Sequence, residues 1–266
     1  MKVLILGSKG MLGSICSYYL KENNVDVVEF NERFQRENTS EYIKDIKSYS
    51  PDIIINCIGK IPQKESSASD YITSNILLPK ALSEANLSCI IIHASTDCVF
   101  EPNSERTGSN DFTNAVDDYG CSKAIGDKVI LVNPMSYVIR ASIIGITKGN
   151  YSSGLLDWFV SNENEVVDGY TDHYWNGITT LSWIKFVYKT FISTDEYKNI
   201  PKLIHLGSDS PVSKYDILSY ANDIFRLNRN LLKKNTLSPC DRTLKVDIFC
   251  GSVRQQIVDL KEQFSE

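Results

Sequence analysis

Short apolar runs alternate with helical patterns through the first 140 residues, and this alternation limits the fold more than any other feature of the chain. Runs such as Ile53-Ile54-Ile55 are apolar throughout, as in parallel strands that are covered by helices on both faces. The predicted strands are 3–6, 25–30, 53–56, 88–94 and 137–139, and the predicted helices are 11–21, 40–48, 71–85 and 117–131. The pattern predicts an α/β fold with a doubly wound parallel sheet.

A glycine-rich turn, GSKGMLG at residues 7–13, directly follows the first predicted strand. Glycine fits where a Cβ atom would meet a phosphate group or would block the packing of a helix on a strand. The helix that begins at this turn directs its backbone N–H groups toward a pyrophosphate. Because the turn lies at the first strand–helix junction of an alternating chain, it predicts a Rossmann-type, dinucleotide-binding fold.

The end of the second predicted strand indicates which dinucleotide binds. An acidic residue there accepts hydrogen bonds from the ribose hydroxyls of NAD, whereas an arginine favours the extra phosphate of NADP. The segment EFNER at residues 29–33 supplies both charges. We favour NADPH through Arg33, with Arg36 as a second candidate and NADH as the alternative cofactor. The alternative that Arg33 is a solvated surface charge stays open.

The regular alternation fades after residue 140, where Trp158, Trp175 and Trp183 lie between polar loops. This change predicts a dinucleotide-binding domain at residues 1–140. Residues 141–266 are then mainly a smaller C-terminal substrate lobe, with some segments returning to the first domain. The polar stretch 101–114 is predicted to be a surface loop.

One tyrosine of the chain, Tyr119, has a lysine four residues later, Lys123. This spacing puts both side chains on one face of a helix. A nearby ammonium group favours the phenolate, so we expect Lys123 to lower the pKa of Tyr119 from about 10. Tyr119 would then give a proton to a carbonyl oxygen as a hydride reaches the carbon.

Thr96 lies at the end of the predicted strand that precedes this helix, in the segment ASTDCVF at residues 94–100. Ligands of open α/β sheets bind at the carboxyl ends of the strands. We therefore expect the Thr96 hydroxyl to reach the same carbonyl oxygen as Tyr119. The alternative that Ser95 and Thr96 simply cap the strand end stays open.

Composition excludes several classes of partner and site. The 28 basic and 33 acidic residues give a net charge of −5 and form no basic cluster, so nucleic acid is not an expected partner. The first apolar run has four residues, too few for a signal peptide or a membrane span, and we expect a cytoplasmic chain without a membrane partner. Seven cysteines without a CxxC pair favour buried thiols, and the three scattered histidines predict no metal site.

Together these features resemble the extended short-chain dehydrogenase/reductase superfamily, and within it the dTDP-4-dehydrorhamnose reductase-like, sugar-nucleotide-binding branch. The resemblance runs nearly from end to end. It is carried by GSKGMLG (7–13), PDIIINC (51–57), Asn75, STDCVF (95–100), YGCSKAIGD (119–127), RASIIG (140–145), GLLDWF (154–159), NGITTL (176–181) and CDRTL (240–244).

The resemblance implies NAD(P)H-dependent reduction of the 4-keto group of a nucleotide-linked 4-keto-6-deoxyhexose, a step of polysaccharide biosynthesis, and a homodimer as the assembly to test. It implies the catalytic residues Thr96, Tyr119 and Lys123. The implied cofactor-binding residues are Gly7, Gly10, Met11, Leu12, Gly13, Arg33, Cys57, Gly59 and Asn75. The implied substrate-binding residues are Asp97, Trp175, Asn176 and Arg242, of which Arg242 suits a diphosphate oxygen.

Departures from the family pattern leave the sugar and the nucleotide open. Cys98 stands where an aromatic residue is usual, and Thr179 where a proline is common. A sugar-nucleotide dehydratase would need a carboxyl group at the position of Cys98, so we do not favour it. A sugar-nucleotide epimerase and a non-catalytic binding subunit that keeps the cofactor fold remain the alternatives.

Overall fold

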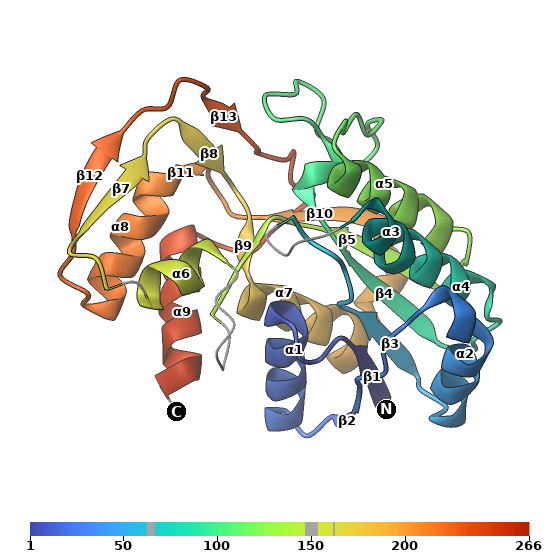
Figure 1. Cartoon of the computed structure of the whole chain (residues 1–266). Coiled ribbons are helices and arrows are strands. Elements are labelled where there is room, and N and C mark those ends of the chain that lie inside the picture. The colour runs from blue at the N-terminus through green and yellow to red at the C-terminus, as the bar shows by residue number, and fades with distance from the viewer. Residues whose placement is uncertain (63–66, 147–153, 162, 266) are drawn as a thin grey trace.

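The computed structural model describes residues 1–62, 67–146, 154–161 and 163–265. Within these ranges the largest sheet has the strand order β14-β10-β5-β4-β3-β1-β2, and each neighbouring pair is parallel (Figure 1). Its strands are β1 (Lys2–Leu6), β2 (Asp26–Phe30), β3 (Ile53–Asn56), β4 (Ile90–Ser95), β5 (Ser136–Arg140), β10 (Leu203–Gly207) and β14 (Ile248–Phe249). The expected parallel sheet is confirmed.

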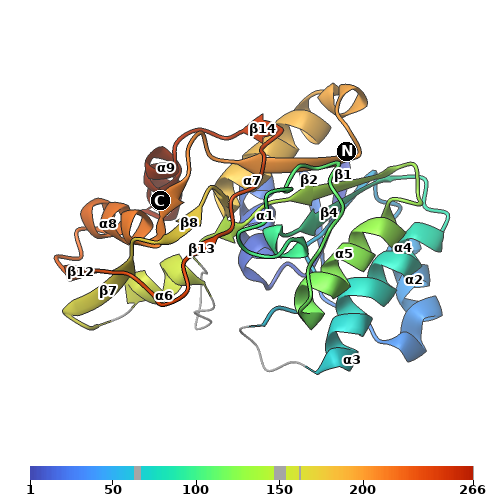
Figure 2. The same cartoon turned by 90° about the horizontal axis from the view of Figure 1, so that it is seen from above.

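Helices cover both faces of this sheet (Figures 1 and 2). Alternate strand residues point to opposite faces, so Val3 and Ile5 pack in one apolar cluster while Leu4 and Leu6 pack in another. The first cluster includes side chains of α1 (Met11–Glu22) and α7 (Thr180–Val187). The second includes side chains of α2 (Thr39–Ser48), α4 (Leu78–Glu84) and α5 (Asp118–Ile130). The fold is therefore doubly wound, as its apolar strands predict.

The helix expected at residues 71–85 differs most from its prediction. It begins earlier, with α3 (Ala68–Tyr71), and continues through a π-helical segment, Ile72–Leu77, before α4. α5 packs closely against this segment at Gly126. A Cβ atom at that position would lie only 2.1 Å from the Asn75 carbonyl oxygen. Single π turns of this kind are frequent at functional sites, and apolar periodicity does not reveal them.

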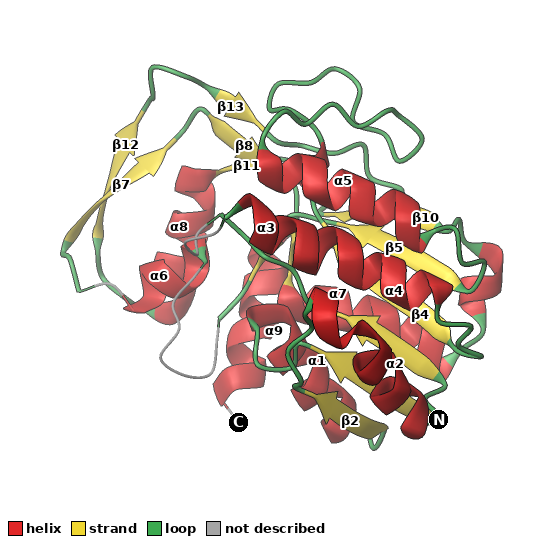
Figure 3. Ribbon diagram, turned by 45° about the vertical axis from the view of Figure 1, so that its right-hand side comes forward, coloured by secondary structure: helices red, strands yellow, loops and turns green. Residues whose placement is uncertain are grey.

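A smaller group of elements follows β5 (Figure 3). Its helices are α6 (Leu155–Ser161), α8 (Lys214–Phe225) and α9 (Val253–Ser265). Its strands are β6 (Ile143–Ile144), β7 (Val166–Tyr170), β8 (His173–Trp175), β9 (Ile178–Thr179), β11 (Val212–Ser213), β12 (Asn230–Lys234) and β13 (Cys240–Asp241). They form the pairings β11-β8-β13, β12-β7 and β6-β9.

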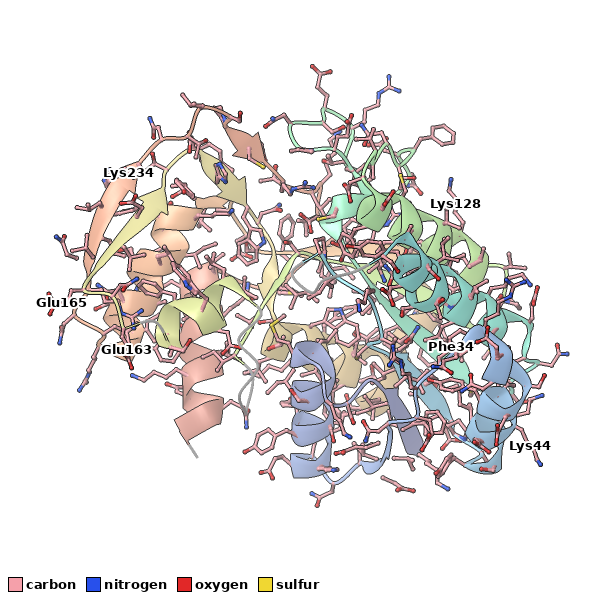
Figure 4. The ribbon with its side chains drawn as sticks, in the orientation of Figure 1. Phe34, Lys44, Lys128, Glu163, Glu165 and Lys234 are labelled. Atoms are coloured by element: carbon pink, nitrogen blue, oxygen red, sulfur yellow. The ribbon has the colours of Figure 1, made fainter. Side chains whose placement is uncertain are left out.

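The two parts of the chain share an apolar core. Ile217 of α8 and Ile257 of α9 belong to the same cluster as β1 and α1. β10 and β14, although late in sequence, extend the large sheet beside β5. Side chains such as Lys234 and Glu165 lie at one end of the molecule, far from Lys128 on α5 (Figure 4). That residues 1–140 bind the dinucleotide and residues 141–266 mainly bind the substrate stays a prediction.

A helix that spans a bilayer needs about 20 consecutive, predominantly apolar residues. Across residues 1–62, 67–146, 154–161 and 163–265, none of the helices is both long and apolar enough to span a membrane.

Candidate active site

The glycine-rich turn brings the start of α1 to the carboxyl end of β1. Gly7 has a φ of +81°, which favours glycine, and a Cβ atom on Gly13 would lie 2.2 Å from the Gly7 carbonyl oxygen. Gly10 precedes α1 and provides no side-chain cap, so the first N–H groups of the helix, at Met11 and Leu12, are left for another acceptor. This helix end fits a phosphate group.

The acidic residue within β2 does not face this site. Glu29 accepts hydrogen bonds from Ser17 and Lys21 of α1, and the Lys21 and Ser17 bonds hold the pKa of its carboxyl group below the usual value. Asn31, just after β2, accepts a hydrogen bond of 2.8 Å from the Ser8 hydroxyl within the glycine-rich turn. The residue beside the turn at this strand end is therefore a neutral amide.

A cavity of about 490 Å³ opens beyond the ends of β2 and β3. It is lined by Glu32, Arg33, Phe34, Gln35, Arg36, Glu37, Ile58, Ser69, Asp70, Thr73 and Ser74. Ile58 links it to the turn, because a Cβ atom on Gly7 would lie 2.9 Å from its side chain. The cavity therefore adjoins the phosphate-binding turn and exposes Arg33 and Arg36 to a ligand.

Asn75 holds the loop that follows β3. Its side chain is fully buried, accepts from the Lys60 N–H at 2.8 Å, and donates to the Lys60 carbonyl at 3.1 Å and to Ser122 of α5 at 2.9 Å. Gly59 lies against the same amide, and Cys57 is half-buried at the start of this loop. Because its amide already bonds to protein groups, we expect Asn75 to affect a cofactor through the loop.

Thr96 and Tyr119 meet because α5 approaches the end of β4 closely. A Cβ atom on Gly120 would lie 2.2 Å from the Cys98 carbonyl oxygen, so only glycine permits this contact. Asp117 caps the helix by accepting from the Gly120 N–H at 2.8 Å, which puts Tyr119 in the first turn. The Tyr119 side chain lies beside Thr96, whose hydroxyl donates to Asp97 Oδ1 at 3.1 Å.

The pKa of Tyr119 is raised from 10, which contradicts the expected lowering by Lys123. Burial raises it most; the Thr96 hydrogen bond lowers it, and the charges of Cys98, Asp97 and Asp127 raise it further. Lys123 instead directs its Nζ atom to the Ala94 carbonyl oxygen at 2.8 Å. The phenol therefore stays protonated at neutral pH, which is the state of a proton donor.

Lys123 itself is almost fully buried. Burial lowers its pKa to about 8, although the charges of Asp127 and Cys57 oppose that change. Its Nζ atom lies 3.2 Å from Nε2 of His93, a buried residue of β4. Lys123 thus loses its proton more readily than an exposed lysine.

A buried polar network behind the three catalytic candidates was missed from the sequence. Asp127 of α5 forms a 2.8 Å ion pair with Arg140 of β5, and Arg140 lies 3.5 Å from His205 of β10. Burial, with the charge of Arg140, lowers the pKa of His205 to about 4. The signal was present: His93 and His205 lie inside apolar runs of their strands, and Arg140 ends the apolar run of β5.

Two substrate-binding candidates lie beside the catalytic candidates. Asp97 is buried; burial raises its pKa, while the Arg242 charge and a Ser142 hydrogen bond lower it in part. Arg242 is half-buried and donates to the Phe100 carbonyl at 3.2 Å. Burial raises the pKa of Cys98 to about 12, so this thiol stays neutral.

Trp175 and Asn176 have different surroundings. Trp175 packs in the main apolar core. The Asn176 amide donates to the Leu244 carbonyl at 2.8 Å and accepts from the Leu244 N–H at 3.0 Å. Asn176 therefore anchors the segment that carries Arg242. Direct contact of Trp175 and Asn176 with a substrate stays a prediction.

The polar loop at residues 101–114 contacts the same segment. Asn103 and Asp241 exchange hydrogen bonds of 2.7 Å, and Lys245 donates to the Thr107 carbonyl at 3.3 Å. Other parts of the loop are exposed, such as Phe112 at 92%. In the described ranges, no cluster of three or more His, Cys, Asp or Glu side chains is arranged to hold a metal ion.

Comparison with family models matches residues 1–245 to the family described as the RmlD substrate binding domain. The chain belongs to this family. The match includes the glycine-rich turn, the three catalytic candidates and Arg242, and it confirms the family resemblance that the sequence motifs indicate.

Solved structures show the same fold at low sequence identity. A dTDP-4-dehydrorhamnose reductase from Clostridium acetobutylicum has a TM-score of 0.80 and 20% identity, with 100% of both chains covered. One from Bacillus anthracis, in complex with NADP, has a TM-score of 0.83 and 16% identity, covering 98% of this chain and 99% of the other. The Bordetella bronchiseptica enzyme WbmG, in complex with NAD and UDP, has a TM-score of 0.75 and 12% identity, covering 99% and 93%.

Proposed function

We propose that this chain is an oxidoreductase that uses NADPH, or alternatively NADH, to reduce the 4-keto group of a nucleotide-linked 4-keto-6-deoxyhexose. The observation that carries the proposal is the placement of the buried Tyr119 phenol beside Thr96 at the carboxyl end of β4, with the buried Lys123 one helical turn later. Membership of the RmlD family supports it. So do the similar structures, two of which are dTDP-4-dehydrorhamnose reductases.

The residues of the glycine-rich turn fit the pyrophosphate of a dinucleotide. The uncapped start of α1 provides N–H donors at Met11, Leu12 and Gly13. Arg33 and Arg36 in the adjoining cavity suit the extra phosphate of NADPH. When bound, the reduced nicotinamide supplies the hydride for the reaction.

Tyr119 then provides the proton. Its raised pKa keeps the phenol protonated throughout the neutral range, so it donates to the oxygen that gains negative charge during reduction. Thr96 lies beside the phenol and orients the same oxygen. Arg242 holds a diphosphate oxygen of the substrate, because its guanidinium is half-buried and positively charged beside Asp97.

The chemistry at Cys98 favours reduction over elimination of water. A dehydratase needs a second group that exchanges protons near neutral pH, whereas the Cys98 thiol has a pKa of about 12. At position 98 the site therefore has a neutral thiol where a dehydratase would need a carboxyl group.

We also propose a cytoplasmic location and a homodimer. All seven cysteines, each within the described ranges, are free thiols, as is usual for proteins of a reducing compartment. Sedimentation of the purified chain tests the dimer, and a monomer at micromolar concentration would contradict it.

The function is tested by following NADPH and NADH oxidation with dTDP-4-keto-6-deoxyhexose generated in situ and with a UDP-linked analogue alongside. We expect oxidation that depends on the sugar and is faster with NADPH. The Tyr119→Phe variant is the control for chemistry at the site. Tight cofactor binding with no oxidation on either sugar would contradict the reductase and favour an epimerase or a binding subunit.

A further inference from the structure

His93 has a fully buried imidazole within β4 that lies between Asn56 of β3 and Lys123 of α5. Its Nδ1 atom lies 3.0 Å from the side-chain nitrogen of Asn56 on β3. Its Nε2 atom lies 3.2 Å from Nζ of Lys123 on α5. The imidazole is therefore in direct contact with the proposed catalytic lysine.

The neighbours of Asn56 determine which nitrogen of His93 carries the proton. The Ile58 backbone N–H donates to Asn56 Oδ1 at 3.1 Å, and a backbone N–H only donates. The amide NH₂ of Asn56 therefore faces His93 and donates to Nδ1. A neutral imidazole has one protonated nitrogen, so the proton of His93 lies on Nε2, on the side of Lys123.

This tautomer distinguishes the two protonation states of Lys123. The His93 Nε2–H points into the space shared by Lys123 Nζ and, at 4.0 Å, Asp127 Oδ1. An ammonium group has three donors and no acceptor, so it gains no hydrogen bond from Nε2–H. A neutral amine has a lone pair and accepts it. In either state Lys123 donates to the Ala94 carbonyl oxygen.

We propose that His93, oriented by Asn56, is a positioning residue that stabilises the neutral amine of Lys123 through its Nε2–H. The neutral amine then forms more readily while the imidazole keeps its own proton. The kinetic part of this inference rests on the proposed reductase function, whereas the tautomer does not.

Charged groups on the surrounding elements act in both directions on Lys123. Asp127, also on α5, favours the ammonium, and so does Cys57 after β3. Asp127 is in turn paired with Arg140 of β5, which reduces its effect. Burial first, and then the charge of Lys123, keep the pKa of His93 well below 6.5. His93 therefore stays neutral while Lys123 titrates.

The tautomer is measured by ¹⁵N NMR of the wild-type chain labelled at histidine. With three histidines in the sequence, the His93 signals are assigned by their loss in the His93→Gln variant. We expect the Nε2–H tautomer and no titration between about pH 6 and pH 9. An Nδ1–H tautomer, or a His93 titration within that range, would overturn the inference whatever the chain catalyses.

A matched pair of variants tests the effect on Lys123. In His93→Asn the amide reaches the place of Nδ1, keeping the contact with Asn56 and losing the donor to Lys123. In His93→Gln the amide nitrogen reaches the place of Nε2 and keeps that donor. Both side chains are polar and smaller than or similar to the imidazole, and circular dichroism checks that both variants fold.

The readout is kcat against pH, in which we expect an alkaline limb from loss of the Lys123 ammonium. We expect His93→Asn to move this limb upward by about one pH unit, a tenfold change in proton affinity. His93→Gln should stay near the wild-type profile. Equal profiles for the wild type and His93→Asn, or equal shifts in both variants, would overturn the inference. A wild-type chain without reductase activity would contradict the proposed function, and the NMR result would then decide this inference alone.

Discussion

The cofactor end and the proton-transfer end of the site are built in different ways. At the cofactor end, the glycine-rich turn offers backbone N–H groups, and exposed Arg33 and Arg36 line an open cavity. At the proton-transfer end, Lys123 is buried with a network of polar side chains from neighbouring strands. Changes at the first end should therefore affect ligand binding, whereas changes at the second should affect chemistry and stability.

The largest effect is expected at the proton donor. Tyr119→Phe removes the phenolic proton and keeps the aromatic ring, whose centroid lies 6.1 Å from that of the Tyr71 ring. General acid catalysis contributes roughly 100- to 10,000-fold, so kcat should fall by that factor with little change in NADPH affinity. Stopped-flow rates and cofactor titration measure the two quantities. Turnover near the wild-type rate would remove Tyr119 from the acid role.

A large loss of folding stability is expected when the buried ion pair between Asp127 and Arg140 is broken. Asp127→Asn leaves the buried Arg140 charge without its carboxylate partner, which costs about 3–5 kcal/mol of unfolding free energy. Glu84→Gln breaks the exposed pair with Lys80 and serves as the control, at about 0.3–0.5 kcal/mol. Urea unfolding measures both. Similar losses in the two variants would show that the network does not stabilise the fold.

At the cofactor end, substitutions of Gly13 and Gly10 distinguish an effect on the packing of the turn from an effect on NADPH binding. Gly13→Ala puts a Cβ atom 2.2 Å from the Gly7 carbonyl oxygen, and such overpacking costs about 1–3 kcal/mol. Gly10→Ala meets that oxygen at 3.4 Å, an ordinary contact. We expect Gly13→Ala to lower both the melting temperature and NADPH affinity, and Gly10→Ala to lower affinity alone. Unchanged affinity in both variants would exclude the turn as the phosphate site.

The smallest effect is expected at Arg33, which is exposed. Arg33→Ala should weaken NADPH by roughly tenfold, in line with a charge-assisted hydrogen bond of about 1.5 kcal/mol, and should leave NADH nearly unchanged. Fluorescence titration with both cofactors measures the difference. Arg106→Ala, in the loop at residues 101–114, is the control for a general change of charge. Equal weakening of NADPH and NADH would exclude Arg33 as the phosphate ligand.

The two ends also differed in how well the sequence predicted them. The turn at residues 7–13 and the strand ends are local patterns, so their places in the sheet follow from apolar periodicity and from the order of the elements. The network around Lys123 joins β3, β4, β5 and α5, and the π-helical segment at Ile72–Leu77 has no periodic signal. The expected lowering of the Tyr119 pKa was wrong because Lys123 Nζ contacts Ala94 and His93 and burial dominates.

The most direct test of the proposed reduction follows the hydride itself. The chain is mixed with NADPH deuterated on either face of nicotinamide C4 and with dTDP-4-keto-6-deoxyhexose, and the product is analysed by mass spectrometry and NMR. We expect one deuterium at sugar C4 from one of the two labelled cofactors, and far slower transfer in Tyr119→Phe. A product without deuterium from either cofactor, formed while NADPH remains bound and unoxidised, would contradict the reductase.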